Sequence, residues 1–237
     1  MKKTIITLSV LAMLFTTLLF GENEFKKPAS FKDYKQYTLD DMMVFISPKL
    51  IKSMKIKKSK DKNTHASVKT MFLTIKGEEV KLSIDPGASD DFSFVFKHNG
   101  KETMIAGESV FISQSGTIYI SNRTNENYEV KRKFKITKNG VKELKQAFLS
   151  VNMECETSAL ATLYSEQGGK GNIVANIPKG KKVKVLLNAF TVSKSDIDNS
   201  KDYLVQTSFG LVGWVRSSSG YMQEKGKPLG CLMYEGD

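Results

Sequence analysis

The chain has 237 residues, with 36 Lys and Arg against 25 Asp and Glu, and its formal net charge at pH 7 is +11. A hydrophobic content of 40% and a charged content of 26% are typical of globular proteins, and they exclude the disordered and fibrous classes. Two Cys and two His are too few for a zinc framework or a disulfide-dense scaffold, so we expect no metal site and no cofactor. The length suits one or two domains, each with a core of its own.

The N-terminal segment has the pattern of a secretion signal. Met1-Lys2-Lys3 is a short basic region, and an uncharged apolar run from Thr4 to Phe20 follows it. This order predicts a signal peptide over residues 1–21 that is cleaved after Gly21. The alternative is a retained membrane anchor, for which the run lies at the lower end of the spanning range of about 17–25 residues. We therefore expect an extracytoplasmic protein, either periplasmic or secreted.

The basic excess is concentrated in the N-terminal half. Residues 22–150 contain 24 basic and 16 acidic residues (+8), whereas residues 151–237 contain 10 and 9 (+1). The richest stretch, residues 49–62, predicts a surface for an anionic envelope polymer, with a solvated face as the alternative. Its candidate contacts are Lys49, Lys52, Lys55, Lys57 and Lys58. Nucleic acid is not an expected partner, because the chain carries a secretion signal and no known nucleic-acid-reading motif.

Two short helices are expected near the start of the mature chain. In residues 38–46, Thr38 precedes Asp40 and Asp41 as a helix cap would, and four apolar residues supply a buried face. Ser47 and Pro48 then have the residue types of a second helix start.

From Val68 onward the apolar residues alternate with a period of two, which indicates β-strands. Asn99-Gly100 and Asn139-Gly140 have the composition of tight hairpin turns. His98 precedes the first of these turns, and we expect it to be solvated. Residues 22–150 are thus predicted to form an α+β domain in which short helices precede an antiparallel sheet or a small barrel.

The C-terminal part repeats short apolar strands separated by glycine-containing turns. Its clearest steps are Ile177 to Leu186, which contains Pro178-Lys179-Gly180, and Gly210 to Val215, which reads Gly-Leu-Val-Gly-Trp-Val. Five strands at this spacing are suited to a small closed barrel. Residues 158–222 resemble the bacterial SH3-like (SH3b) domain on these two steps. The whole chain is therefore predicted to be mainly β.

The resemblance implies a non-catalytic binding module that is directed at peptidoglycan or its peptides. Candidate ligand-binding residues on such a barrel are its aromatic side chains, Tyr164, Tyr203, Phe209 and Trp214. Trp214 also fits a core position, because valines flank Gly213-Trp214. The chain departs from the family pattern in its first strand, in Asp202-Tyr203 and in a long insertion over residues 188–201.

The two cysteines flank this module. In an SH3-like barrel the chain termini lie close together, so the resemblance implies that Cys155 and Cys231 meet in a disulfide. An oxidising compartment outside the cytoplasm permits the bond. The alternative is a pair of free, buried thiols.

No catalytic residues are predicted. A papain-like peptidase, which often accompanies such modules, orders Cys before His, whereas His65 and His98 both precede Cys155 and Cys231. Ser115–Tyr119 (Ser-Gly-Thr-Ile-Tyr) resembles a motif of small periplasmic lysozyme inhibitors, and a plain turn entering a strand is the alternative reading.

We therefore expect a signal peptide at 1–21, a β-rich domain of unknown function at 22–150 and an SH3-like barrel at 151–237. The expected function is non-catalytic binding or scaffolding in a bacterial envelope, with peptidoglycan or an envelope protein as partner. One alternative is inhibition of a secreted hydrolase through Ser115–Tyr119. The other is an enzyme of unrecognised type in the N-terminal half.

Overall fold

The fold is that of a computed structural model, which describes residues 27–60, 67–87, 92–123, 126–189, 200–218, 220–221 and 227–234. The chain divides into two compact units, residues 1–33 and residues 34–237. In the first, the described residues form only the short 3₁₀ helix η1 (Ala29–Phe31). The predicted signal peptide and His65 lie outside the described residues. No helix in the described part of the chain is long and apolar enough to cross a membrane.

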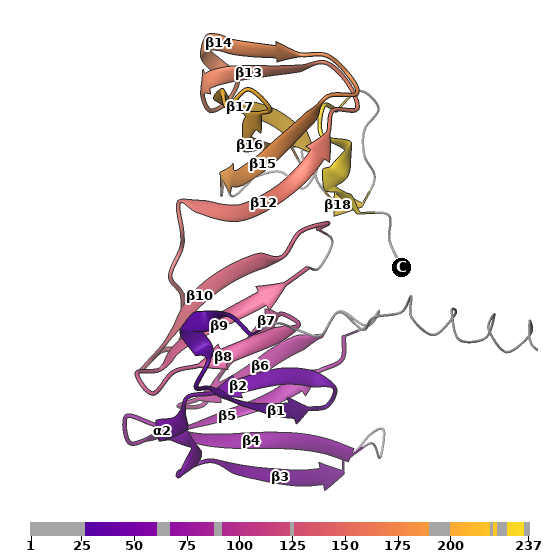
Figure 1. Ribbon diagram of the computed structural model, residues 1–237. Helices are drawn as coiled ribbons and strands as arrows, with labels where there is room; N and C mark the ends of the chain where they lie inside the picture. The colour runs from indigo at the N-terminus through magenta and orange to yellow at the C-terminus, as the bar shows by residue number, and fades with distance from the viewer. Residues whose placement is uncertain are drawn as a thin grey trace, which may run out of the picture. The chain divides into compact units, whose positions relative to one another are not determined.

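The second unit is mainly β, as the sequence predicts, and its first part is built from two sheets (Figure 1). A six-stranded sheet has the order β1-β2-β8-β9-β10-β11, in which β2 and β8 are parallel and the other neighbours are antiparallel. Its strands are β1 (Lys35–Leu39), β2 (Met42–Ile46), β8 (Ser109–Ile112), β9 (Thr117–Asn122), β10 (Val130–Thr137) and β11 (Gly140–Glu143).

The other sheet of this part has five antiparallel strands in the order β3-β4-β5-β6-β7. Its strands are β3 (Lys55–Lys60), β4 (Ser67–Ile75), β5 (Glu78–Asp85), β6 (Ser93–His98) and β7 (Lys101–Ala106). Both sheets contribute to one buried apolar cluster, for example Val110 and Ile118 from the first and Leu82 and Phe96 from the second. The two sheets therefore share a core as a sandwich does, because each sheet has one apolar face to bury.

The helix predicted over residues 38–46 is wrong, because these residues form the hairpin β1–β2. Its turn residues, Asp40 and Asp41, have φ angles of 44° and 69°, as a type I′ turn requires. The backbone N–H of Lys69 donates to Asp40 Oδ2 over 3.0 Å, which ties the turn to β4. Since β2 is buried on both faces, its sequence lacks the polar alternation that reveals a half-exposed strand.

Other local predictions are confirmed. Pro48 begins the one-turn helix α2 (Pro48–Ile51), whose Leu50 side chain is buried in the sandwich core. Asn99 and Gly100 have φ angles of 49° and 73° and connect β6 to β7 in a two-residue turn. The hairpin β10–β11 is also present, with positive φ at Gly140.

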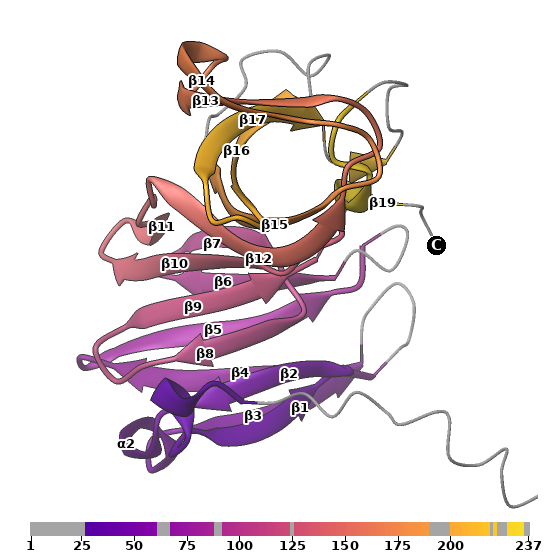
Figure 2. The ribbon, with the colours of Figure 1, turned by 45° about the horizontal axis from the view of Figure 1, so that its top comes forward.

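Another six-stranded sheet has the order β12-β15-β16-β17-β13-β14 and curls around its own core (Figure 2). Its edge strands β12 and β14 do not pair with each other among the described residues, and we call this curled sheet the barrel. Its strands are β12 (Phe148–Glu156), β13 (Ala161–Glu166), β14 (Lys170–Ile177), β15 (Lys182–Ala189), β16 (Ser200–Thr207) and β17 (Val212–Ser218). The five strands expected from the sequence are present, and β12 is added at the sheet edge beside β15. Residue 151, where the sequence places the domain boundary, lies within β12.

The pairing of β13 with β17 depends on a glycine. These strands are joined through the pair Tyr164 and Trp214. A Cβ atom on Gly213 would lie 2.8 Å from Leu163 Cβ and 3.1 Å from the Tyr164 carbonyl oxygen. Any larger residue would push the two strands apart, so Gly213 permits the close approach that curls the sheet.

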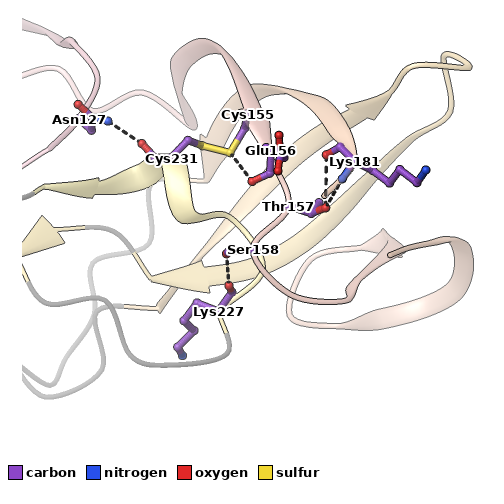
Figure 3. The surroundings of a disulfide bond; sticks show 8 residues. All are labelled: Asn127, Cys155, Glu156, Thr157, Ser158, Lys181, Lys227 and Cys231. Atoms are coloured by element: carbon purple, nitrogen blue, oxygen red, sulfur yellow. Dashed lines mark hydrogen bonds between the residues drawn. A yellow bond between two sulfur atoms is a disulfide. The ribbon is translucent and has the colours of Figure 1, made fainter. Parts of the chain in front are cut away.

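The sulfur atoms of Cys155 and Cys231 lie at disulfide distance, with their Cα atoms 5.5 Å apart, as the resemblance implies (Figure 3). Cys155 lies in β12 and Cys231 in the 3₁₀ helix η2 (Gly230–Leu232), which is followed by the short strand β19 (Met233–Tyr234) beside β18 (Gly220–Tyr221). Nearby, the Thr157 hydroxyl donates to the Pro178 carbonyl over 2.7 Å and accepts from the Lys181 N–H over 3.0 Å. The bond thus fastens the C-terminal segment to the strand at which the barrel sheet begins.

Candidate binding surface

The four aromatic residues predicted to bind a ligand fall into three different environments. Tyr203 is fully buried among the valines of the barrel core, so it has no surface to offer a ligand. Phe209 lies at the tip of the β16–β17 hairpin and is 88% exposed. Tyr164 and Trp214 are partly buried and lie directly opposite each other on β13 and β17. Of the predicted set, the structure brings only Tyr164 and Trp214 together as neighbours in the sheet.

Strand alternation decides this division. Leu163 and Val215 point into the barrel core, so their neighbours Tyr164 and Trp214 point outward. In β16, Tyr203 points inward and Leu204 outward, so the prediction that Tyr203 lies on the ligand-binding surface is wrong. Trp214 is therefore an outer-face residue rather than a core residue.

Tyr164 and Trp214 belong to a row of outward-facing residues that crosses five strands, which we call the apolar stripe. The sheet register places each member opposite the next: Ile173, Tyr164, Trp214, Leu204 and Leu187. Cross-strand partners have Cβ atoms about 5 Å apart, so such a row forms a continuous surface. Ile173 is 59% exposed, and the other four side chains are partly buried.

Phe148 extends the apolar stripe toward β12. Its ring centroid lies 5.8 Å from that of Trp214, with the ring planes tilted by 32°. Because β15 and β16 separate β12 from β17, the two rings lean toward each other over the intervening strands. Flat aromatic faces beside leucines can hold the apolar face of a sugar ring or an aliphatic peptide side chain.

A shallow groove of about 450 Å³ lies next to the apolar stripe, because Gln206, which lines it, is two residues from Leu204 on the same strand. Its lining also includes Phe209 and Gly210 from the β16–β17 hairpin and the charged residues Lys182, Lys184 and Glu154. Lys184 and Lys182 face Glu154 and Glu156 across β12 and β15, so the charges at this groove are mixed. It offers polar and charged contacts next to an apolar surface, as peptide-binding sites do.

Sequence reasoning missed Phe148, Ile173, Leu187 and Leu204. The signal that would have found them is the alternation itself: once Leu163 and Val215 are assigned to the core, every second residue faces outward. The insertion after β15 and the bulges in β14 and β15 obscured the register that aligns these residues.

The lysines predicted to bind an anionic polymer are all exposed. Lys49 and Lys52 lie at α2, whereas Lys55, Lys57 and Lys58 lie on β3, the edge strand of the five-stranded sheet. Lysines on an edge strand also hinder pairing with another chain. The Lys57 ammonium lies 5.1 Å from the centre of the Phe72 ring, so part of this charge is used within the sheet.

The Ser115–Tyr119 motif forms the tight connection between β8 and β9 and the start of β9. The Ser115 hydroxyl lies 2.9 Å from the Ser113 hydroxyl and 3.1 Å from that of Thr117. Tyr119 is partly buried beneath the Lys133 ammonium, which lies 5.7 Å from the ring centre. The motif therefore lies in a compact hairpin rather than in a long projecting loop.

His98 is buried and not solvated, which corrects the prediction. Its Nε2 atom lies 2.9 Å from Glu78 Oε2, and its Nδ1 lies 3.1 Å from the Glu79 carbonyl oxygen. The imidazole therefore joins β6 to β5 and anchors the hairpin turn. No group of three or more His, Cys, Asp or Glu side chains with metal-binding geometry occurs among the described residues.

Comparisons with family models, curated proteins and solved structures give no match to this chain.

Proposed function

We propose that the protein is a non-catalytic, extracytoplasmic binding protein of a bacterial envelope, and that its C-terminal barrel binds peptidoglycan or its peptides. The supporting observation is the apolar stripe, in which Tyr164 and Trp214 lie side by side in the middle of an outward-facing row. Apolar patches on a protein surface are frequently binding sites. The signal-like N-terminus and the resemblance to SH3b domains favour a wall ligand.

The binding mode follows from the surface. Trp214 and Tyr164 provide flat faces for sugar C–H groups or peptide methyl groups, and Leu204 and Leu187 continue the row beside Trp214. The neighbouring groove adds Lys182, Lys184 and Glu154 as contacts for the charged groups of a peptide. A ligand held in this way is bound without any bond being made or broken.

Sedimentation of the mature chain, residues 22–237, with purified peptidoglycan tests the proposal. We expect the wild type to co-sediment and Trp214→Ala to bind at least about tenfold more weakly, since a central aromatic anchor commonly contributes this much. Phe209→Ala tests the groove separately, and Leu160→Ala is the matched control, because Leu160 is 63% exposed and lies outside both the apolar stripe and the groove lining. Circular dichroism establishes that each variant is folded.

Two outcomes would contradict the proposal. If the wild type stays in the supernatant, peptidoglycan is not the ligand. If Phe209→Ala loses binding while Trp214→Ala retains it, the ligand occupies the groove and the apolar stripe has no role.

A further inference from the structure

A second candidate site lies on the sandwich, at the end where several of its strand connections meet. A cavity of about 510 Å³ is lined by Tyr34, Ser47, Lys76, Ser113, Gln114 and Ser115. We call it the hairpin-end cavity. These side chains offer hydroxyl, amide and ammonium groups, and none of the lining residues is acidic.

Lys76 and the serines of the β8–β9 connection are held in place by the turns in which they lie. Lys76 and Gly77 form the β4–β5 turn with φ angles of 53° and 85°. The Ser113 N–H bonds to the Thr117 carbonyl over 2.9 Å, which closes the β8–β9 connection. A Cβ atom on Gly116 would lie 3.1 Å from Ile75 Cγ2, so this connection packs directly against the end of β4.

Ser47 lines the cavity, and its hydroxyl does not do what its position before a helix would suggest. It precedes α2 at the capping position, yet its side chain makes no capping hydrogen bond. The residue is only 8% exposed, and its backbone N–H is already used by the Ile112 carbonyl over 3.0 Å. A buried hydroxyl that does not cap its own helix remains able to donate to a ligand in the cavity.

Lysine side chains also lie near the β8–β9 connection. Lys135 Nζ donates to the Ser115 carbonyl over 2.8 Å and to Thr117 Oγ1 over 3.0 Å. Burial, together with the charges of Lys76 and Lys133, lowers the pKa of Lys135. Lys135 is thus repelled by Lys76 and by Lys133, and an anion beside Lys135 would relieve that repulsion.

We propose that the hairpin-end cavity binds a phosphate group through the Lys76 ammonium, the Ser47 hydroxyl and the one O–H proton that the hydrogen-bonded hydroxyls of Ser113, Ser115 and Thr117 leave free. Phosphate oxygens accept several hydrogen bonds at once, which matches a cavity lined by donors. Lys135, held by Ser115 and Thr117, adds a second positive charge beside the bound group. The phosphate comes either from a soluble compound or from the phosphomonoester head group of an envelope lipid.

Titration of inorganic phosphate into the mature full chain, followed by two-dimensional NMR, tests this proposal. We expect saturable shifts of the backbone amides of residues 113–117. Lys76→Asn removes the charge and keeps the turn, because Asn tolerates positive φ, and it is expected to weaken phosphate binding about tenfold. Ser47→Ala provides a second variant should Lys76→Asn fail to fold: it removes a hydroxyl that makes no capping hydrogen bond, and it is also expected to weaken phosphate binding.

Lys58→Asn is the matched control, since it removes one positive charge from β3 and leaves the cavity unchanged. Equal phosphate affinities for wild type and Lys76→Asn, equal losses in Lys76→Asn and Lys58→Asn, or no saturable shifts would each overturn the proposal. Sedimentation with phosphatidylcholine vesicles, with and without phosphatidate, separates the two sources. Binding of phosphate alone indicates a soluble ligand, whereas Lys76-dependent binding to phosphatidate vesicles indicates a lipid.

Discussion

The side-chain amide of Asn188 donates a hydrogen bond to the Tyr128 hydroxyl over 2.6 Å. Asn188 lies in barrel strand β15, whereas Tyr128 lies in the connection between sandwich strands β9 and β10. Tyr128 is 4% exposed and belongs to the barrel core cluster. The neighbouring Asn127 side chain donates to the Cys231 carbonyl over 2.7 Å, at the disulfide (Figure 3). One connection of the sandwich therefore completes the barrel, and we expect the two to unfold together.

Alkaline pH is expected to weaken the fold through Tyr128. Burial, and secondly the charge of Glu126, raises the pKa of Tyr128 to about 12. The pKa of tyrosine in the unfolded chain is about 10. The stabilisation from keeping Tyr128 neutral in the folded protein is therefore complete below pH 10, and it is lost as the pH rises toward 12. Urea unfolding at pH 8 and pH 11 should show a loss of about 1 kcal/mol from this group.

Tyr128→Phe should lose less stability between these two pH values than the wild type, because phenylalanine does not ionise. Asn188→Ala is the control, since it removes the hydrogen bond but keeps the titrating group. If Tyr128→Phe and the wild type lose the same amount, Tyr128 does not carry the alkaline effect.

Loss of the disulfide is expected to destabilise the protein strongly. Cys155 and Cys231 are separated by 76 positions, and closing so long a loop stabilises a fold by about 4 kcal/mol in the chain-entropy model. Urea unfolding of the double variant Cys155→Ser, Cys231→Ser should show this loss. The wild type in dithiothreitol should match the double variant, and a loss below about 1 kcal/mol would contradict the prediction.

Acid should weaken the pairing of β10 with β11 through Glu143. Hydrogen bonds from Arg132, over 2.9 and 2.8 Å, hold the pKa of Glu143 below its usual value. The stabilisation from ionised Glu143 is therefore present above about pH 4.3, the usual pKa of glutamate. It is lost as the pH falls through the lower pKa that Glu143 has in the folded protein. Glu143→Gln should cost about 1 kcal/mol or less at pH 7, and the difference from the wild type should shrink at pH 2.5.

The exposed pair Lys81 and Glu79, with its charged atoms 3.8 Å apart, provides the comparison. Glu79→Gln should change stability by less than about 0.5 kcal/mol at pH 7. An effect as large as that of Glu143→Gln would mean that net charge, and not the paired geometry, governs the acid response.

Gly213→Ala should destabilise the barrel by about 1–3 kcal/mol, because the added methyl group would overlap Leu163 and the Tyr164 backbone. Thermal unfolding measures the loss. Val212→Ala, at the adjacent and 41% exposed position, should cost less than the glycine substitution. A neutral Gly213→Ala would show that β13 and β17 separate easily.

Local conformational preferences account for the turns and the helix start that the sequence predicts correctly. Asn99-Gly100 forms its turn because both residues tolerate positive φ, and Pro48 begins a helix because its ring already holds the required φ. Residues 38–46 mislead for the same local reason: Asp40 and Asp41 suit a helix start as well as a type I′ turn. Only pairing of β2 with β8 on one side and β1 on the other selects the strand.

The sequence predicts which aromatic residues lie in strands, but not which of them form the candidate surface. Tyr164 and Trp214 are visible as aromatic residues in strands, but which face each occupies depends on register, and a slip of one residue reverses every side chain. Tyr203 was therefore placed on the surface while Leu204, which occupies it, was overlooked. His98 was expected in water because its turn is exposed, yet its own side chain folds against Glu78.

The sequence left open whether Cys155 and Cys231 pair, but by itself it determined the mainly β class and the hairpin turns. These two features depend on φ preferences and on apolar alternation, which act within a few residues. Tertiary structure alone decided the apolar stripe, the hairpin-end cavity and the entry of Tyr128 into the barrel core. Each of these joins strands that are distant in the chain, so each exists only once packing has set the register.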